Sequence, residues 1–241
     1  MTSKFADSDW LRPPRTRNGQ PTLSREQILR AAMEILDAEG PGGLSMRRLG
    51  TKLGSGATSL YWHVANKDEL LELAVDEVIG EIYVPEPGDT SWRIGVSVWA
   101  NGMRSALLRH PWVIGLLGTH PTLGPNAMRM GERIVLLLSG AGFAGMPLSH
   151  ASAVINAHAI GAATTEAAAH AAIKRGGLDM AGVAEQMKPY VEKMADEHPA
   201  YDKWRREAGV AVQDQQQLLD EGFAFGLERL LDGLELWLAK G

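Results

Sequence analysis

The segment from Ser45 to His63 constrains the fold of this chain more than any other stretch. It contains two short apolar patterns of helical spacing on either side of a glycine turn at 54–56. Leu49, Leu53 and Leu60 are placed to face inward and to anchor both pieces on a longer neighbouring helix. Two short helices joined by a tight turn and supported by a third predict a helix-turn-helix.

The supporting helix is expected directly before this motif. Ser24 and Gln27 have the spacing of a capping box, and apolar residues at 28, 29, 32, 35 and 36 fall on one helical face. The Gly-Pro-Gly-Gly run at 40–43 ends the pattern. A further helix is expected after Asn66, with Glu69 as its capping-box partner, and it continues to the break at 84–89.

The rest of the sequence predicts helices and no strands. The expected ranges are 91–109, 111–117, 123–141, 147–174, 183–196 and 212–240, and the pattern is weakest at 175–206. We therefore expect an all-α fold with an N-terminal three-helix, helix-turn-helix domain at 22–68. A flexible basic arm at 1–21 precedes it, and a larger helical regulatory and dimerisation domain follows at 69–241.

Charge is divided unevenly along the chain. Residues 1–65 contain nine Lys or Arg against six Asp or Glu, an excess of three positive charges within a net charge of −5. The remainder accordingly carries −8. A basic head on an acidic body favours contact with a polyanion at one end only, although an excess of three charges also arises by chance.

Several function classes are disfavoured by composition. The chain has no cysteine, which excludes disulfides, thiolate metal ligands and a thiol nucleophile and fits a reducing cytoplasm. The N-terminus lacks the apolar core of a signal peptide. The weakly charged stretch 147–173 is rich in Ala, with 11 among its 27 residues, and holds three His and an Asn, so we expect a buried helix and no membrane span.

The second short helix is expected to present polar and aromatic groups that can meet base edges in the major groove. These outward groups are Thr58, Ser59, Tyr61, Trp62 and His63. The groups suited to phosphates are Arg47, Arg48 and Lys67, together with the helix N-terminus at Ser45. The plainer alternative is a helical hairpin with a solvated face, but a large exposed aromatic pair requires a reason.

The run from Leu44 to Leu71, LSMRRLGTKLGSGATSLYWHVANKDELL, resembles the DNA-binding domain of the tetracycline-repressor (TetR) family. Short motifs such as Leu-Gly-Thr at 117–119 and the Gly-Leu-Glu pair at 226 and 233 resemble the regulatory domain of the same family, more weakly. The resemblance implies a homodimeric transcriptional regulator, usually a repressor, that places its second helix-turn-helix helix in the major groove of a palindromic operator. The family's polar base-reading residue falls at Ala57 here, so the bases read should differ from those of the tetracycline operator.

The resemblance does not extend to the tetracycline site. The family's metal-binding His falls at Leu116, its other drug-binding His near Tyr83 and its drug-binding Asn near Trp99. The family's carboxylate on its eighth helix has a neighbour in Glu166, but one residue away from the matching position. We therefore expect no metal and no cofactor. A loose His158, Glu166 and His170 grouping on one predicted helix is too weak to indicate a metal site.

An apolar effector is still expected in the regulatory domain, because large apolar side chains there are accompanied by few polar groups. The candidate ligand-binding residues are Trp99, Met103, His110, Trp112, His120, Met128, Asn156, His158 and Glu166. For each of the apolar members, simple core packing is the competing interpretation.

The predicted helices at 147–174 and 212–240 are the candidate dimer interface. Gly222, Gly226 and Gly233 lie close together in angle beside a leucine-rich stripe, which permits close approach of another helix. They either pack against the Ala-rich helix of the same subunit or build a four-helix interface with a second subunit.

Two other function classes stay open at this point. One is an enzyme in a helical bundle, although the chain has no Gly-rich phosphate loop, G-x-S-x-G or H-E-x-x-H motif. The other is a partner-binding module that uses Tyr61 and Trp62 as anchors. We favour a ligand-responsive DNA-binding regulator over both. The sequence leaves its operator, effector and regulated genes open.

Overall fold

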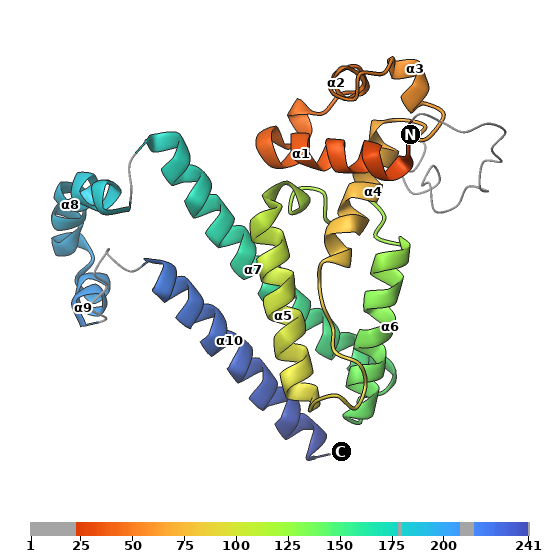
Figure 1. Cartoon of the computed structure of the whole chain (residues 1–241). Coiled ribbons are helices and arrows are strands. Elements are labelled where there is room, and N and C mark those ends of the chain that lie inside the picture. The colour runs from red at the N-terminus through yellow and green to blue at the C-terminus, as the bar shows by residue number, and fades with distance from the viewer. Residues whose placement is uncertain (1–22, 178–179, 208–214, 241) are drawn as a thin grey trace, which may run out of the picture.

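The computed structural model of this chain describes residues 23–177, 180–207 and 215–240, and this part is all helical (Figure 1). The order of elements is α1 Arg25–Gly43, α2 Met46–Lys52, α3 Ala57–Leu60, α4 Lys67–Gly80, α5 Trp92–Arg109, η3 Pro111–Val113, α6 Pro125–Gly140, α7 Gly145–Gly176, α8 Met180–Glu197, α9 Pro199–Glu207 and α10 Gln215–Leu238. No strand occurs in the described ranges, which confirms the predicted fold class. The predicted arm at 1–21 lies outside the described residues.

The N-terminal helices form because their ends are capped as the sequence predicts. Ser24 and Gln27 make the reciprocal bonds of a capping box at the start of α1. The helix geometry breaks at Gly40, whose φ of 69° lies in the left-handed region that suits glycine. Ser45 accepts the Arg48 backbone N–H at 3.2 Å and begins α2.

α4 links the small N-terminal domain to the body (Figure 1). Asn66 accepts the Glu69 backbone N–H at 2.8 Å, which caps its start as predicted. Most of its side chains are buried, because α4 packs against α1 on one side and α6 on the other. A shift of α4 is therefore felt in both domains.

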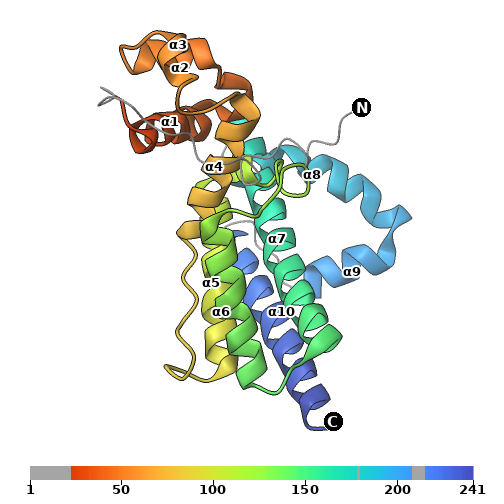
Figure 2. The same cartoon turned by 90° about the vertical axis from the view of Figure 1, so that its right-hand side faces the viewer.

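The body is a bundle of α5, α6, α7 and α10 whose long helices run side by side (Figure 2). Its core contains Trp99, Phe143, Leu138 and Ile155, all almost fully buried. The first helix after α5 is shorter than the predicted 111–117: the chain forms only the single turn η3 and then a loop with a bend at Gly118, φ 78°. Pro111 can start a helix, but residues 114–116 form turns instead of continuing it.

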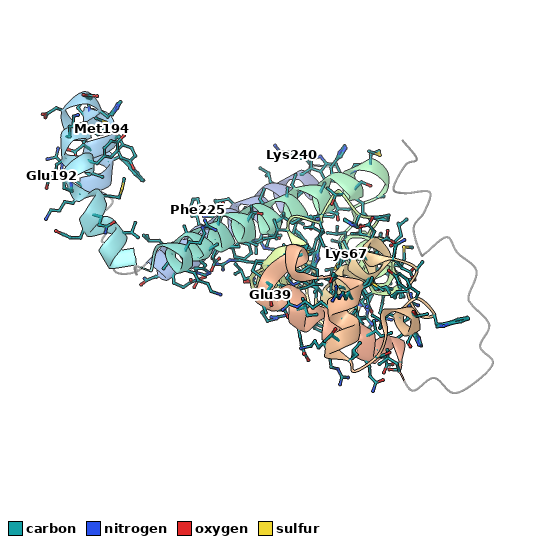
Figure 3. All side chains as sticks on the ribbon, turned by 90° about the horizontal axis from the view of Figure 1, so that it is seen from above. Glu39, Lys67, Glu192, Met194, Phe225 and Lys240 are labelled. Carbon is teal, nitrogen blue, oxygen red and sulfur yellow. The ribbon has the colours of Figure 1, made fainter. Side chains whose placement is uncertain are left out.

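α8 and α9 form a hairpin that extends from the end of α7 and lies apart from the bundle (Figures 1 and 3). The sequence predicts a helix at 183–196 but gives no clear pattern for 199–207, so α9 was missed. α9 is short, and its large apolar residues are Tyr201 and Trp204. Both of these side chains are exposed, whereas the polar Asp202 between them is buried.

No single helix of the described part is both long and apolar enough to cross a membrane. α6 and α7 meet the criterion only when taken together, by length and composition alone, and they are bent by 117° at their junction.

Candidate DNA-binding surface and regulatory core

The helix-turn-helix is held by the anchors that the sequence predicts. Leu49 and Leu60 are fully buried, and Leu53 packs partly buried against the same core. Gly54 adopts a φ of 61°, which lets the chain reverse between α2 and α3 without strain. The anchors fix the spacing of the two short helices on α1.

The side chains predicted to read bases gather on the outer side of α3 and the turn after it. Thr58 and Ser59 are exposed on α3. α3 ends at Leu60, so Tyr61, Trp62 and His63 lie in the following turn and not on a longer helix. Trp62 is 78% exposed and Tyr61 48%, whereas His63 is half-buried. An exposed aromatic pair beside two hydroxyls is a surface suited to recognition.

The predicted phosphate-binding cations are in different states. Arg47 is exposed, and its side chain has no hydrogen bond or ion pair within the described residues. Arg48 makes a bidentate pair with Glu39, and Lys67 donates to the Pro41 carbonyl at 2.6 Å. The Arg48 hydrogen bonds hold the pKa of Glu39 below its usual value. Of these three cations, Arg47 alone could meet a phosphate without losing a side-chain bond made within the described residues.

Acidic residues on α1 were missed as part of this surface. Glu39 pairs with Arg48, and Glu34 pairs with Lys52 at 2.8 Å, so α1 neutralises two cations of α2. The contacts depend on how α1 and α2 cross. The charges themselves are visible in the sequence, but their pairing is not.

Most of the predicted effector-binding residues lie in or near the core of the body. Trp99, Met103, His110, Trp112, His120 and Glu166 are buried, and Asn156 and His158 are half-buried. Met128 is 60% exposed on α6, so the described chain does not place it inside the bundle as expected. The buried face of α6 consists of its own residues Ile134, Leu137 and Leu138. Met128 lies off that face and therefore outside the bundle.

Three of these residues carry a buried polar atom without a hydrogen-bond partner among the described residues. They are Trp99 Nε1, His120 Nε2 and Asn156 Oδ1. An unpaired buried polar group costs about 1–3 kcal/mol, so each such atom calls for a partner of some kind. An indole donor and an amide acceptor are available to a bound molecule that reaches them.

Glu166 is already partnered. Arg104 on α5 donates to its Oε2 from Nε at 2.9 Å, and Gln216 on α10 donates to its Oε1 at 2.7 Å. Arg104 also donates to Asp220 at 2.6 Å and lies over the Phe223 ring. This buried network ties α5, α7 and α10 together.

His158 occupies the contact between α7 and α10. Its Nε2 lies 2.9 Å from the Phe223 carbonyl oxygen, and its ring stacks on that of Phe223. A Cβ at Gly226 would lie 2.4 Å from His158 Cε1, so glycine is required there. Gly222 and Gly233 face open space. One predicted glycine therefore serves packing within the subunit, and the other two stay available.

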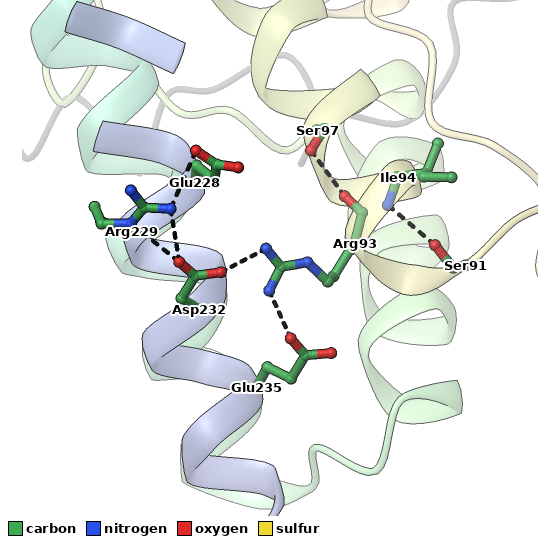
Figure 4. Close-up of polar contacts among 8 residues, drawn as sticks. All are labelled: Ser91, Arg93, Ile94, Ser97, Glu228, Arg229, Asp232 and Glu235. Atoms are coloured by element: carbon green, nitrogen blue, oxygen red, sulfur yellow. Dashed lines mark hydrogen bonds and ion pairs between the residues drawn. The ribbon is translucent and has the colours of Figure 1, made fainter. Parts of the chain in front are cut away.

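α10 is further fixed to α5 by surface ion pairs (Figure 4). Arg93 of α5 donates to Asp232 of α10 at 2.7 Å and to Glu235 of α10 at 2.8 Å. Arg229, which is also on α10, donates to Asp232 as well. These bonds hold the pKa of Asp232 below its usual value, first through Arg93 and then through Arg229. Among the described residues no group of three His, Asp or Glu could hold a metal ion.

Fold and site together define a class: a helix-turn-helix DNA-binding protein with a separate helical body. The family model "Bacterial regulatory proteins, tetR family" matches residues 28–74, and "Tetracyclin repressor-like, C-terminal domain" matches 84–238. The chain therefore belongs to the TetR family of transcriptional regulators, as the sequence motifs predicted, and to no enzyme family considered above.

Named relatives agree with this assignment. An HTH-type transcriptional regulator of Saccharopolyspora erythraea is 40% identical over 65% of this chain and 66% of its own length. The HTH-type transcriptional repressor DrrR1 of Streptomyces coeruleorubidus is 34% identical over 93% of this chain and 82% of its own. ActR of Streptomyces coelicolor without ligand superposes with a TM-score of 0.74 at 29% identity, covering 92% of this chain and 99% of ActR. ActR with actinorhodin superposes at 0.73 and 32% identity, covering 89% and 96%.

Proposed function

We propose that this protein is a homodimeric repressor that binds a palindromic operator and is released from it by a small hydrophobic effector. The observation that carries the proposal is the exposed surface of Thr58, Ser59, Tyr61 and Trp62 on a rigidly anchored helix-turn-helix. In the major groove, hydroxyls can bond to base edges and aromatic rings can contact thymine methyl groups. Arg47 and the α2 N-terminus at Ser45 would hold the phosphate backbone.

The two-fold operator follows from a dimer. Apolar side chains stay exposed along α10, and Gly222 and Gly233 beside them leave room for a partner helix. We infer that α7 and α10 of two subunits form a four-helix interface, which places two reading helices about 34–36 Å apart on one side of the duplex. A regulator of chromosomal DNA would act in the cytoplasm.

The effector would enter the body near α5 and α7. The unpaired polar atoms of Trp99 and Asn156, set among apolar neighbours, favour a mostly apolar ligand with a hydrogen-bond acceptor and a donor. ActR, a related protein, has been solved in complex with the small molecule actinorhodin, which supports an effector site in this body. Effector binding would release DNA because it favours one domain arrangement over the other.

The test begins with selection of bound fragments from random duplex DNA, followed by a gel-shift assay. We expect recovery of a palindrome and a loss of at least tenfold in affinity for Tyr61→Ala, with helicity unchanged. The control is Tyr83→Ala, which removes a somewhat more exposed tyrosine beyond α4. Recovery of no common sequence would overturn the proposal and would favour a protein partner for Tyr61 and Trp62.

A further inference from the structure

A polar cluster joins the DNA-binding domain to the body at one place. Asp37 of α1 lies 2.6 Å through Oδ1 from His110 Nδ1, and the same oxygen accepts the Trp112 indole N–H at 2.7 Å. The other ring nitrogen of His110 lies 3.1 Å from Glu81 Oε1, just after α4. Arg109 donates to the second oxygen of Glu81 at 2.6 Å. We call Asp37, Glu81, His110 and Trp112 the junction cluster.

The cluster lies where three separate elements meet. Asp37 belongs to the helix that supports α2 and α3, Glu81 ends the linking helix α4, and His110 and Trp112 lie at the turn from α5 into η3. α1 and η3 are neighbours in the structure, above the bundle in Figure 1. The His110 imidazole of the body thus contacts the N-terminal domain at Asp37 of α1 and the end of the linking helix α4 at Glu81.

The two rings of the cluster are buried, whereas Asp37 and Glu81 are partly exposed. His110 is 9% exposed and Trp112 8%, with their rings edge to face at 6.1 Å, so neither ring can turn away without opening the core. Asp37 receives two donors on one oxygen, and a charge-assisted bond of this kind is stronger than a neutral one. Loss of Asp37 would leave a buried indole N–H without a partner.

We propose that Asp37, His110 and Trp112 are positioning residues that fix the orientation of the DNA-binding domain relative to the body. η3 follows directly from α5, which carries Trp99 and Met103 in the core, so a displacement of α5 reaches α1 through this cluster. This consequence rests on the proposed effector response. The positioning role itself does not, and it can be measured without DNA or effector.

The experiment measures the distance between the two domains in the full-length protein. Spin labels are attached at Arg30→Cys on α1 and Glu132→Cys on α6, both exposed sites in a chain with no cysteine of its own. Labelled protein is mixed with an excess of unlabelled protein so that distances within one chain dominate. Electron–electron double resonance then gives the distance distribution.

Two variants test the cluster, and one matched variant controls for it. Asp37→Ala removes both bonds on an exposed helix site where Ala is the better helix former, and Trp112→Phe removes the indole N–H together with part of the buried ring. Glu34→Ala breaks a pair on the same helix, to Lys52, that stays within the DNA-binding domain. Circular dichroism verifies that each variant is folded.

We expect a single narrow distribution for the parent and for Glu34→Ala, and a distribution at least twice as wide for Asp37→Ala and Trp112→Phe. Operator affinity should fall three- to tenfold in both cluster variants with an unchanged salt slope, because no phosphate contact is lost. Narrow distributions in both cluster variants would overturn the proposal. Equal broadening in Glu34→Ala would overturn it too, since any lost pair on α1 would then suffice. If no operator exists, the distance measurement still decides the positioning role.

Discussion

At the residue scale, the surface cations differ in what they give up on meeting DNA. Arg47 has no internal contact to break within the described chain, whereas Arg48 must leave Glu39. An exposed pair of this kind contributes little to stability. If Arg48 contacts DNA as predicted, the Glu39 carboxylate would compete with a phosphate for its guanidinium, so we expect Glu39 to lower DNA affinity at little cost to the fold.

Glu39→Gln should therefore strengthen binding to duplex DNA of any sequence. We expect a several-fold lower Kd near 50 mM salt and a slope of log K against log salt that is steeper by up to about 0.9, the value for one added phosphate contact. Arg47→Ala should change the slope by a similar amount in the opposite direction. Fluorescence anisotropy on a random-sequence duplex measures both, and an unchanged slope for Glu39→Gln would show that Arg48 lies away from DNA.

Asp232 provides a pH test at the same scale. Its pKa is lowered in the folded protein by Arg93 and Arg229, so its contribution to stability is present above the usual pKa of 3.8 and is lost as the pH falls through the lowered value. Asp232→Asn should lower the melting temperature slightly at pH 7, and the difference from the parent should vanish well below pH 3.8. Melting curves across pH 2–7 measure this. A difference that persists at the lowest pH would contradict the ion-pair assignment, because it would not depend on charge.

At the element scale, sequence predicts helices wherever their ends and faces are defined locally. The capping box at Ser24 and the N-cap bond of Asn66 were predicted because their bonds span three residues, whereas the expected box partner Glu69 accepts the Ala65 backbone N–H instead. The early end of the helix after Pro111 was not predicted, since residues 114–116 form turns although their sequence Ile-Gly-Leu is also compatible with a helix. The pairing of Arg104 with Glu166, and of Asp37 with His110, joins residues more than 60 positions apart and depends on how the helices cross.

The contact between α7 and α10 gives a glycine prediction with a matched control on α6. Gly226→Ala would force a methyl group against the His158 ring, which is stacked on Phe223, and overpacking of this kind costs about 1–3 kcal/mol. Gly131→Ala, on α6 and outside the proposed dimer interface, meets nothing within 4 Å, and the better helix propensity of Ala should stabilise the protein by up to about 1 kcal/mol. Urea unfolding compares the two variants, and the packing account fails if both shift stability in the same direction.

Asp76 makes a second link between elements. Its carboxylate accepts the Asn126 and Ala127 backbone N–H groups at 3.2 and 2.9 Å, so a residue of α4 caps the start of α6. Asp76→Ala should lower the free energy of unfolding by about 1–2 kcal/mol, the usual effect of losing a cap. Asp68→Ala, an exposed carboxylate in the first turn of α4, is the control for loss of charge alone. Equal losses in both variants would mean that the interdomain cap contributes nothing of its own.

At the scale of the whole molecule, the proposed dimer requires a surface that a second subunit can cover. α7 and α10 lie side by side and form the outer edge of the bundle (Figure 3). Leu218, Phe225, Leu236 and Trp237 of α10 stay exposed there, whereas Phe223, Leu227 and Leu231 of the same helix are buried within the subunit. A helix that is apolar on both sides requires a second partner, and a symmetric pair of such helices is the simplest way to supply it.

Phe225→Glu should therefore convert a dimer into a monomer. Phe225 is 64% exposed in the single chain, so the change breaks little packing within the subunit, but it would bury two like charges near one symmetric interface. Analytical ultracentrifugation should show the parent at twice the chain mass of 26.1 kDa and the variant at the chain mass, with unchanged helicity. Leu123→Glu places the same charge at a similarly exposed site in the loop before α6 and should stay dimeric. A monomeric variant would bind each half of a palindrome separately, so its operator affinity should fall while its binding to random DNA persists. If the Phe225→Glu variant stays dimeric, the dimer interface does not include this face of α10.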